Sequence, residues 1–219
     1  MSILSPNQRN ILDLISKDGM IGRSFYLTGG TALAEFYLDH RLSEDLDFFS
    51  EKEFDPQSIS TFFAKIKKNA NIKTVSIEQS FNRSLFFLSL EDEECIKTEF
   101  THFPFPQIEK GKRINEMNID SLVDIAVNKV FTIYQNPRLR DFIDLFCILE
   151  KEKEWTISNL VEKVRIKFDH HIDPIQLSAQ FVKVEMLKDY PKMIKNIPEK
   201  IWQDFFMSQA GALSKSQIN

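Results

Sequence analysis

The sequence contains little cysteine, no long apolar run and no excess of basic residues, and each absence excludes a class of protein. Its two cysteines, Cys95 and Cys147, have no CxxC or Cys/His partner, so we expect no cysteine zinc site and expect both thiols to be reduced, buried and structural. No apolar stretch approaches the roughly 18 residues of a membrane span. Residues 1–17 lack the features of a secretory signal. We therefore expect a cytoplasmic protein with no membrane partner.

The charge balance argues against a protein that simply coats nucleic acid, because the net charge is −4. Residues 151–219 carry 11 Lys and Arg against 9 Asp and Glu, which leaves +2 there and −6 in residues 1–150. A polyanion, if one binds, is expected to contact the C-terminal part, and metal ions the N-terminal part. The cations available for a polyanion are Lys163, Arg165, Lys167, Lys183, Lys188, Lys192 and Lys195, which otherwise form solvated helix faces.

The composition is that of an ordinary globular protein, with 42% hydrophobic and 27% charged residues among 219. The 20 phenylalanines are a large number for this length and predict a core built largely from that residue. The length allows either one large domain or two small lobes.

Hydrophobic periodicity predicts alternating helices and strands first, and helices afterwards. The expected elements are a helix over 7–17, a strand over 25–27, a helix over 32–38, a strand around 46–49, a helix over 56–69, and strands over 72–78, 84–90 and 95–100. Thr31 is expected to cap the second of these helices. After residues 103–106 the chain is expected to be helical almost to its end, with helices including 137–150 and 155–168.

This order predicts an α+β fold, in which a small mixed β-sheet flanked by helices is followed by a C-terminal helical lobe. We place the boundary after residue 112, so that residues 1–112 form the α/β core and residues 113–219 the helical lobe. The two are expected to share a cleft, which is a common place for a ligand.

A glycine pair, Gly29-Gly30, stands between an expected strand and an expected helix. Glycine lets a backbone approach a phosphate closely, and the N-terminus of a helix offers unpaired N–H groups to the same anion. The alternative is a purely structural turn.

Asp45 and Asp47 are separated by one residue, so that on a strand their carboxylates project from the same face with Cα atoms about 7 Å apart. Two such acids converge readily on one or two Mg²⁺ or Mn²⁺ ions. The alternative is a solvated strand edge, although the apolar neighbours Leu46 and Phe48 favour a nearly buried position where like charges need a cation. Glu99, in another β-prone run, is the candidate third acid, or otherwise an exposed strand position.

Taken together, these residues resemble a known family. Gly29-Gly30-Thr31, then 13 residues, then Asp-x-Asp at 45–47 is similar to the signature of the polymerase-β-like nucleotidyltransferase superfamily. With His40, Arg41 and Ser43 added, the string resembles the AbiEii/AbiGii-type nucleotidyltransferases, the toxin halves of bacterial abortive-infection toxin–antitoxin pairs. The family's lysine and its Arg-Asp-Phe-x-Asp-Leu run are matched by Lys129 and by residues 140–145, so the resemblance covers about residues 20–150.

The resemblance implies a role for each matching residue. Gly29, Gly30 and Thr31 would surround a nucleoside triphosphate, Asp45 and Asp47 would bind metal, and Lys129 would contact the phosphates. Where the superfamily often has a third aspartate, this chain has Glu99, whose extra methylene would alter the metal geometry.

Other residues have two open interpretations. Asp141 and Asp144 lie on one helix face and would point into the cleft, unless they form salt bridges with Arg138 or Arg140. Arg41 and Ser43 would brace the Asp-x-Asp strand or contact phosphate. Arg140 is a further candidate for nucleotide binding. The histidines His40, His102, His170 and His171 are not spaced as a ligand set, and surface or structural roles are expected.

The implied reaction is attack by an acceptor hydroxyl on the α-phosphorus of the triphosphate, with pyrophosphate leaving and Asp47 or Glu99 accepting the proton. The family suggests tRNA or another RNA as acceptor and a separately encoded antitoxin as partner. The alternatives are transfer to a small, antibiotic-type molecule and a non-catalytic nucleotide-binding regulator.

Overall fold

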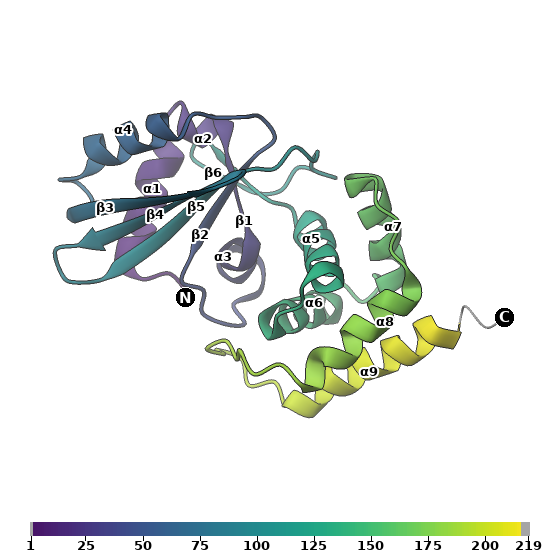
Figure 1. Ribbon diagram of the computed structural model, residues 1–219. Coiled ribbons are helices and arrows are strands. Elements are labelled where there is room, and N and C mark those ends of the chain that lie inside the picture. Colours follow the sequence, from purple (N-terminus) through teal and green to yellow (C-terminus); the bar gives the residue numbers. More distant parts are fainter. Residues whose placement is uncertain (1, 216–219) are drawn as a thin grey trace. The chain divides into compact units, whose positions relative to one another are not determined.

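The computed structural model describes residues 2–215 and divides into two compact units, Met1–Ser121 and Leu122–Asn219, called here the N-terminal and C-terminal units (Figure 1). The N-terminal unit holds a seven-stranded mixed sheet with helices, and the C-terminal unit is helical. The α+β class expected from the sequence is confirmed. Residue 1 and residues 216–219, which fall within the expected core and lobe, lie outside the described residues.

The sheet has the strand order β3-β4-β5-β2-β1-β7-β6. Its strands are β1 (Tyr26–Thr28), β2 (Leu46–Ser50), β3 (Ile72–Ser80), β4 (Arg83–Leu90), β5 (Cys95–His102), β6 (Arg113–Ile114) and β7 (Met117–Ile119). The central strand β2 pairs antiparallel with β1 and parallel with β5. At one edge lies β3, whose residues after Ile72 are mostly exposed.

The helices of this unit are α1 (Pro6–Lys17), α2 (Ile21–Ser24), α3 (Gly29–Leu33), the π-helical turn η1 (Ala34–Leu38) and α4 (Pro56–Ile66). Two of them begin with a side-chain cap followed by proline. Ser5 caps α1 in a capping box with Gln8, and Asp55 caps α4 by accepting a hydrogen bond from the backbone N–H of Gln57.

Phenylalanine builds the core on one face of the sheet, as the composition predicts. Phe48 and Phe100 stack with ring centroids 4.9 Å apart, and Phe63 of α4 lies 5.2 Å from Phe86. All four side chains are fully buried, and each contributes about 1.5–3 kcal/mol of transfer free energy. Because side chains alternate along a strand, the burial of Phe48 directs its neighbour Asp47 to the opposite face.

The C-terminal unit contains α5 (Leu122–Gln135), α6 (Leu139–Lys151), α7 (Ile157–Phe168), α8 (Pro174–Val182), the 3-10 turn η2 (Lys183–Glu185) and α9 (Glu199–Lys215). Its core includes Phe142, Phe181 and Phe206, with Phe206 centred 4.9 Å from Phe142 and 5.2 Å from Phe181. No helix within residues 2–215 is long and apolar enough to cross a membrane.

Three local expectations were wrong. Residues 113–119 contain the short strands β6 and β7 rather than helix. Thr31 does not cap a helix; the N-cap is Thr28, and Thr31 lies inside α3, where its hydroxyl donates to the backbone carbonyl of Asp45. Cys95 is exposed at the start of β5, whereas Cys147 is buried as expected.

We expect Phe63→Ala to lower the free energy of unfolding of the N-terminal unit by about 3–5 kcal/mol, because it empties a fully buried position between α4 and the sheet. Urea denaturation followed by far-UV circular dichroism of the sheet would measure this, since both tryptophans lie in the C-terminal unit. Phe81→Ala is the matched control, since Phe81 is exposed between β3 and β4, and we expect a change within about 0.5 kcal/mol. Equal losses in the two variants would contradict this account of the core.

Candidate functional site

Two of the acids expected in the site lie side by side in the sheet. Asp47 of β2 is the register partner of Glu99 in the parallel strand β5 and of Thr28 in the antiparallel strand β1. Register partners present their side chains on the same face, and neighbouring strands are about 4.8 Å apart. Asp47 and Glu99 are therefore neighbours on the face opposite Phe48. Asp45 precedes β2 by one residue and is half-buried.

The glycine turn packs against charged side chains. A Cβ on Gly29 would overlap Oδ2 of Asp47, and a Cβ on Gly30 would overlap Nη2 of Arg41 and lie 3.2 Å from Oγ of Ser43. Gly29 also has a φ of 72°, in the left-handed region that favours glycine. The turn is thus glycine because a carboxylate and a guanidinium come into contact with its backbone. The structure brings together Gly29, Gly30, Arg41, Ser43 and Asp47.

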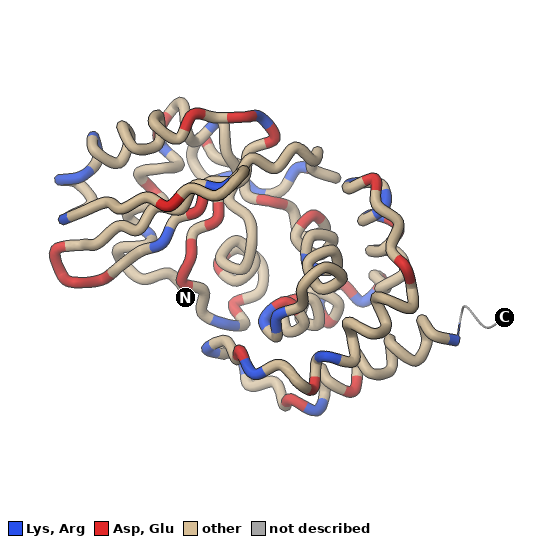
Figure 2. The backbone as a smooth tube through the Cα atoms, in the orientation of Figure 1, with Lys and Arg blue, Asp and Glu red and all other residues tan. Residues whose placement is uncertain are grey.

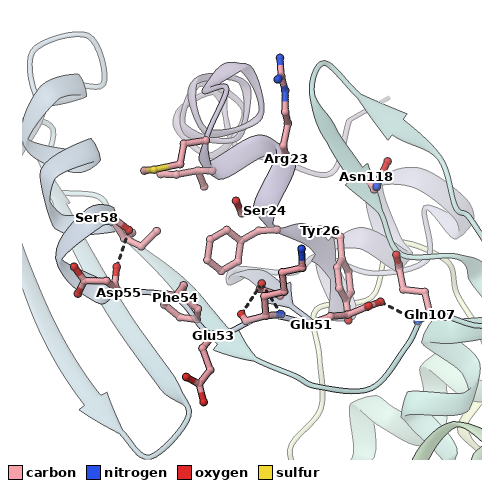
Figure 3. Close-up of a pocket in the computed structure, with 16 residues that line it drawn as sticks. Arg23, Ser24, Tyr26, Glu51, Glu53, Phe54, Asp55, Ser58, Gln107 and Asn118 are labelled. Atoms are coloured by element: carbon pink, nitrogen blue, oxygen red, sulfur yellow. Dashed lines mark hydrogen bonds between the residues drawn. The ribbon is translucent and has the colours of Figure 1, made fainter.

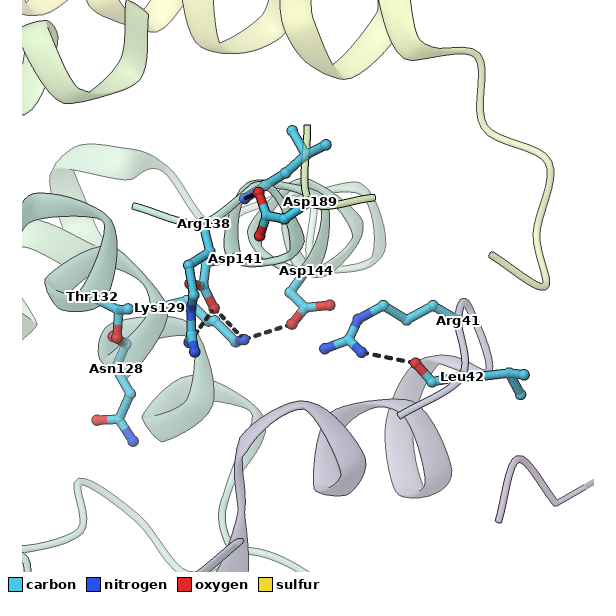
Figure 4. Close-up of polar contacts among 10 residues, drawn as sticks. Arg41, Leu42, Asn128, Lys129, Thr132, Arg138, Asp141, Asp144 and Asp189 are labelled. Atoms are coloured by element: carbon cyan, nitrogen blue, oxygen red, sulfur yellow. Dashed lines mark hydrogen bonds and ion pairs between the residues drawn. The ribbon is translucent and has the colours of Figure 1, made fainter. Parts of the chain in front are cut away.

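The segment between Arg41 and Asp45 is held on several sides. Arg41 is buried, and its Nη1 donates to the carbonyl of Leu42 at 2.9 Å (Figure 4). Gln8 of α1 donates to the carbonyl of Glu44 at 2.8 Å, while the hydroxyl of Thr31 donates to that of Asp45. Arg41 and Ser43 both lie against Gly30, and the segment that carries them is held by Gln8 and Thr31.

The three acids have the donor chemistry and the strand register for a divalent cation, but their carboxylates do not converge. Asp45 forms an ion pair with Lys97, at 3.0 Å, and Glu99 accepts a hydrogen bond from Thr101 at 2.9 Å. A second cation, Arg83 of β4, lies 3.6 Å from Glu99. Among residues 2–215, no three His, Cys, Asp or Glu side chains are arranged to hold a metal ion. Binding a metal there requires these side chains to turn.

Asp120, a polar residue near the turn, was not predicted from the sequence. Asp120 is fully buried after β7, where its carboxylate accepts from Thr28 Oγ1 at 2.6 Å and from Gln107 Nε2 at 2.8 Å. Its carbonyl accepts from the hydroxyl of Tyr37 at 2.8 Å. Asp120 thus fixes Thr28, the residue that leads into Gly29. The region was expected to be helical, and β7 is too short to show a strand pattern.

In the C-terminal unit, Lys129 of α5 lies between two carboxylates of α6. Its Nζ is 2.7 Å from Asp141 and 2.6 Å from Asp144 (Figure 4). Arg138 adds a two-pronged contact to Asp141, at 2.8 Å through Nε and 3.2 Å through Nη2. Asp141 and Asp144 are fully buried and Lys129 nearly so, while Arg140 is half-buried. The four charges of this ion cluster (Lys129, Arg138, Asp141 and Asp144) sum to zero.

The cluster sets the protonation of Asp141. Burial acts to raise the pKa of its carboxyl, but the charges and hydrogen bonds of Lys129 and Arg138 outweigh burial, so this pKa lies below its ordinary value of 3.8. Asp141 is therefore ionised at neutral pH.

One of the proposed polyanion contacts is wrong. Lys167 is buried and donates to Asp124 at 2.7 Å, so its ammonium does not face solvent. A buried ion pair explains why a lysine lies on the inner face of α7. Figure 2 shows that the lysines and arginines of the C-terminal unit alternate with acids rather than forming one basic run.

A cavity of about 530 Å³ lies at the other end of β1 and β2 (Figure 3). Its lining includes Phe25, Tyr26, Phe54 and Glu51, together with Gln107, whose backbone N–H donates to Glu51 at 3.1 Å. None of the residues expected from the sequence to form the site lines this cavity. The cavity is a feature separate from the glycine turn.

The fold is shared with solved structures from Helicobacter pylori. JHP933 and a protein described as a candidate nucleotidyltransferase each match with a TM-score of 0.62 and 18% identity over 97% of this chain, covering 94% and 97% of their own chains. At this identity the likeness shows the fold alone. No protein of curated function matches this sequence.

The model of one family matches residues 21–215, and it describes a nucleotidyltransferase. The chain belongs to that family, the AbiEii nucleotidyltransferase toxins of type IV toxin–antitoxin systems. The resemblance carried by the Gly-Gly-Thr and Asp-x-Asp residues and by the Lys129 region is thereby confirmed.

We expect Gly30→Ala to weaken binding of a nucleoside triphosphate about tenfold, because the new Cβ would displace the Arg41 guanidinium from the turn. The melting temperature is expected to change little, since the displaced atoms are the end of a flexible side chain. Isothermal titration calorimetry with a non-hydrolysable triphosphate would measure the affinity. Gly19→Ala is the matched control, because a Cβ there meets nothing within 4 Å. Unchanged affinity in Gly30→Ala would contradict the role of this turn.

We expect Asp141→Asn to destabilise the C-terminal unit by about 3 kcal/mol at pH 7, because it breaks a buried ion pair. Since the folded-state pKa is lowered, the stabilisation by Asp141 is complete above about pH 5 and is lost as the pH falls below 3.8 towards the folded pKa. Urea denaturation of wild type and variant from pH 7 to pH 3 should show the difference shrinking.

The exposed ion pair of Glu150 and Lys153 supplies the control for this titration, with Glu150→Gln expected to cost less than about 1 kcal/mol. A destabilisation of Asp141→Asn that stays constant down to pH 3 would contradict the assignment.

Proposed function

We propose that this protein is a metal-dependent nucleotidyltransferase that transfers a nucleoside monophosphate from a triphosphate to a hydroxyl of RNA, with tRNA as the first candidate, and that it acts as the toxin of a toxin–antitoxin pair. Membership of the AbiEii family supports both the reaction class and the partner antitoxin. The observation that carries the proposal is the close packing of Asp47 and Arg41 on the backbone of Gly29 and Gly30.

The N-terminal unit would bind the triphosphate at the glycine turn. The backbone of Gly29 and Gly30 allows phosphate oxygens to approach, and the Arg41 guanidinium beside Gly30 offers planar N–H donors to them. Ser43 and Thr31 would add hydroxyl contacts or hold the turn. A bound Mg²⁺ or Mn²⁺, with Asp45, Asp47 and Glu99 as its ligands, would neutralise charge on the phosphates.

In the transfer step, the acceptor hydroxyl oxygen forms a bond to the α-phosphorus while the bond to the bridging oxygen of pyrophosphate breaks. Asp47 or Glu99 would accept the hydroxyl proton. Both lie on the same face of the sheet, in register with one another.

Residues of the C-terminal unit are proposed to assist. Lys129 would contact phosphate as a compact point charge. Asp141 and Asp144 would orient its ammonium, to which both now lie within 2.7 Å. Arg140, half-buried on the same helix, is a further candidate contact.

One observation favours a second candidate function, a nucleotide-binding regulator without turnover. In the described part of the chain, Asp45 is held by Lys97 and no three potential ligands are arranged around a metal position. A protein that kept this arrangement would bind nucleotide without the metal needed for transfer.

We expect the protein to transfer label from α-³²P-labelled triphosphates to total tRNA in Mg²⁺, and Asp47→Asn to reduce the rate at least about 100-fold, because it removes a charge beside the reacting phosphates. Gel analysis of the RNA with each of the four triphosphates would measure this. Asp92→Asn, in the exposed β4–β5 turn, is the matched control and should retain full activity. Triphosphate binding without any labelled acceptor would favour the regulator instead.

A further inference from the structure

Lys97 stands where a positive charge is needed beside the acids. It lies on β5 two residues before Glu99, so both side chains point to the same face of the sheet. Because Leu46 pairs with Thr98, and Asp47 with Glu99, the register places Lys97 opposite Asp45. The Lys97 Nζ lies 3.0 Å from Asp45 Oδ2, and the two side chains are 33% and 32% exposed.

The other end of the acid group is also held by donors of the sheet. Glu99 accepts from Thr101 Oγ1 at 2.9 Å, and an Arg83 nitrogen lies 3.6 Å from the same oxygen. Acids on one sheet face repel one another unless a cation lies among them. In this arrangement the chain supplies that charge from its own side chains, Lys97 and Arg83.

We propose that Lys97 is a placeholder for the metal: its ammonium forms an ion pair with the Asp45 carboxylate in the nucleotide-free protein and is displaced when a divalent cation binds there. This rests on the metal site of the proposed function. A divalent ion on the Asp45 carboxylate would lie close to the Lys97 ammonium, and the repulsion between the two positive charges favours displacement of the ammonium, so metal binding includes the cost of breaking this ion pair. Lys97 is here a positioning residue. Its ion pair fixes the Asp45 carboxylate in place and blocks it until a metal ion displaces the ammonium.

The placeholder has a consequence for the order of binding. The free protein binds divalent ions weakly, because Lys97 competes for Asp45 and repels the incoming ion. A metal that arrives with a triphosphate brings phosphate oxygens with it, and the displaced ammonium, on a flexible and partly exposed stem, is attracted to those oxygens. Metal and nucleotide therefore favour each other's binding.

The test is a titration of nucleotide-free protein with Mn²⁺, in which electron paramagnetic resonance measures the unbound ion. Wild type is compared with Lys97→Met and Lys97→Gln, which keep a side chain without the charge, and with Lys97→Arg, which keeps the charge. Lys73→Met is the matched control, because Lys73 is an exposed lysine of β3, separated from β5 by β4. Thermal denaturation of each variant shows that it is folded.

We expect Lys97→Met and Lys97→Gln to bind Mn²⁺ about fivefold to tenfold more tightly than wild type, and Lys97→Arg and Lys73→Met to bind like wild type. Adding Asp47→Asn to Lys97→Met should remove the gain. A purely structural role for Lys97 would leave the affinity unchanged or weaken it, and either result overturns the placeholder.

Different results would exclude the metal site and the placeholder role of Lys97. If Asp47→Asn abolishes Mn²⁺ binding while the neutral Lys97 variants bind like wild type, the metal site stands and the placeholder falls. If no variant binds Mn²⁺, or if Asp47→Asn changes nothing, the metal site of the proposed function falls as well.

Discussion

The arrangement of the N-terminal unit depends on one close contact, in which the Asp47 carboxylate and the Arg41 guanidinium lie against the bare backbone of Gly29 and Gly30. The two opposite charges lie against neighbouring glycines, where no side chain keeps them from the backbone. The contact is possible because β2 alternates, so that Phe48 enters the phenylalanine core while Asp47 faces the turn. Asp120 accepts a hydrogen bond from the hydroxyl of Thr28, the residue before Gly29, and so holds the start of the turn in place.

The main electrostatic feature of the C-terminal unit is its buried ion cluster. The unit buries two carboxylates on one helix and balances them with Lys129 and Arg138, so the ion cluster carries no net charge. Buried ion pairs stabilise a fold little compared with apolar residues, yet removing one partner is costly. In this arrangement the carboxylates of Asp141 and Asp144 hold the Lys129 ammonium in one position. A fixed cation is useful where a phosphate has to be recognised, because little reorganisation is needed.

Local patterns predicted much of the fold and the strand positions of two candidate acids. The alternation around Asp47 and the β-prone run at Glu99 were sufficient to place these two acids on strands, whereas Asp45 precedes β2 by one residue; only the structure shows that β2 and β5 are neighbours. Short elements were missed, because a strand of three residues such as β7 has no period to recognise.

Ion pairs were missed for another reason. The partners Lys97 and Asp45, or Lys167 and Asp124, are far apart in sequence and meet only through tertiary packing, and a lysine that reads as solvated can then be buried. The pairing of Asp141 with Arg138 was foreseen as one of two interpretations, because Arg138, the N-cap of α6, and Asp141 in its first turn are only three residues apart.

The edge strand β3 bears on how the protein behaves at high concentration. It is nine residues long, its outer side is not paired with another strand of the sheet, and Ile77 within it is 44% exposed. Open edges of this kind pair readily with strands of other molecules. Lys73 and Glu78, both exposed on β3, oppose such pairing, because a second chain would have to desolvate them. The charges of this strand thus disfavour intermolecular sheet growth.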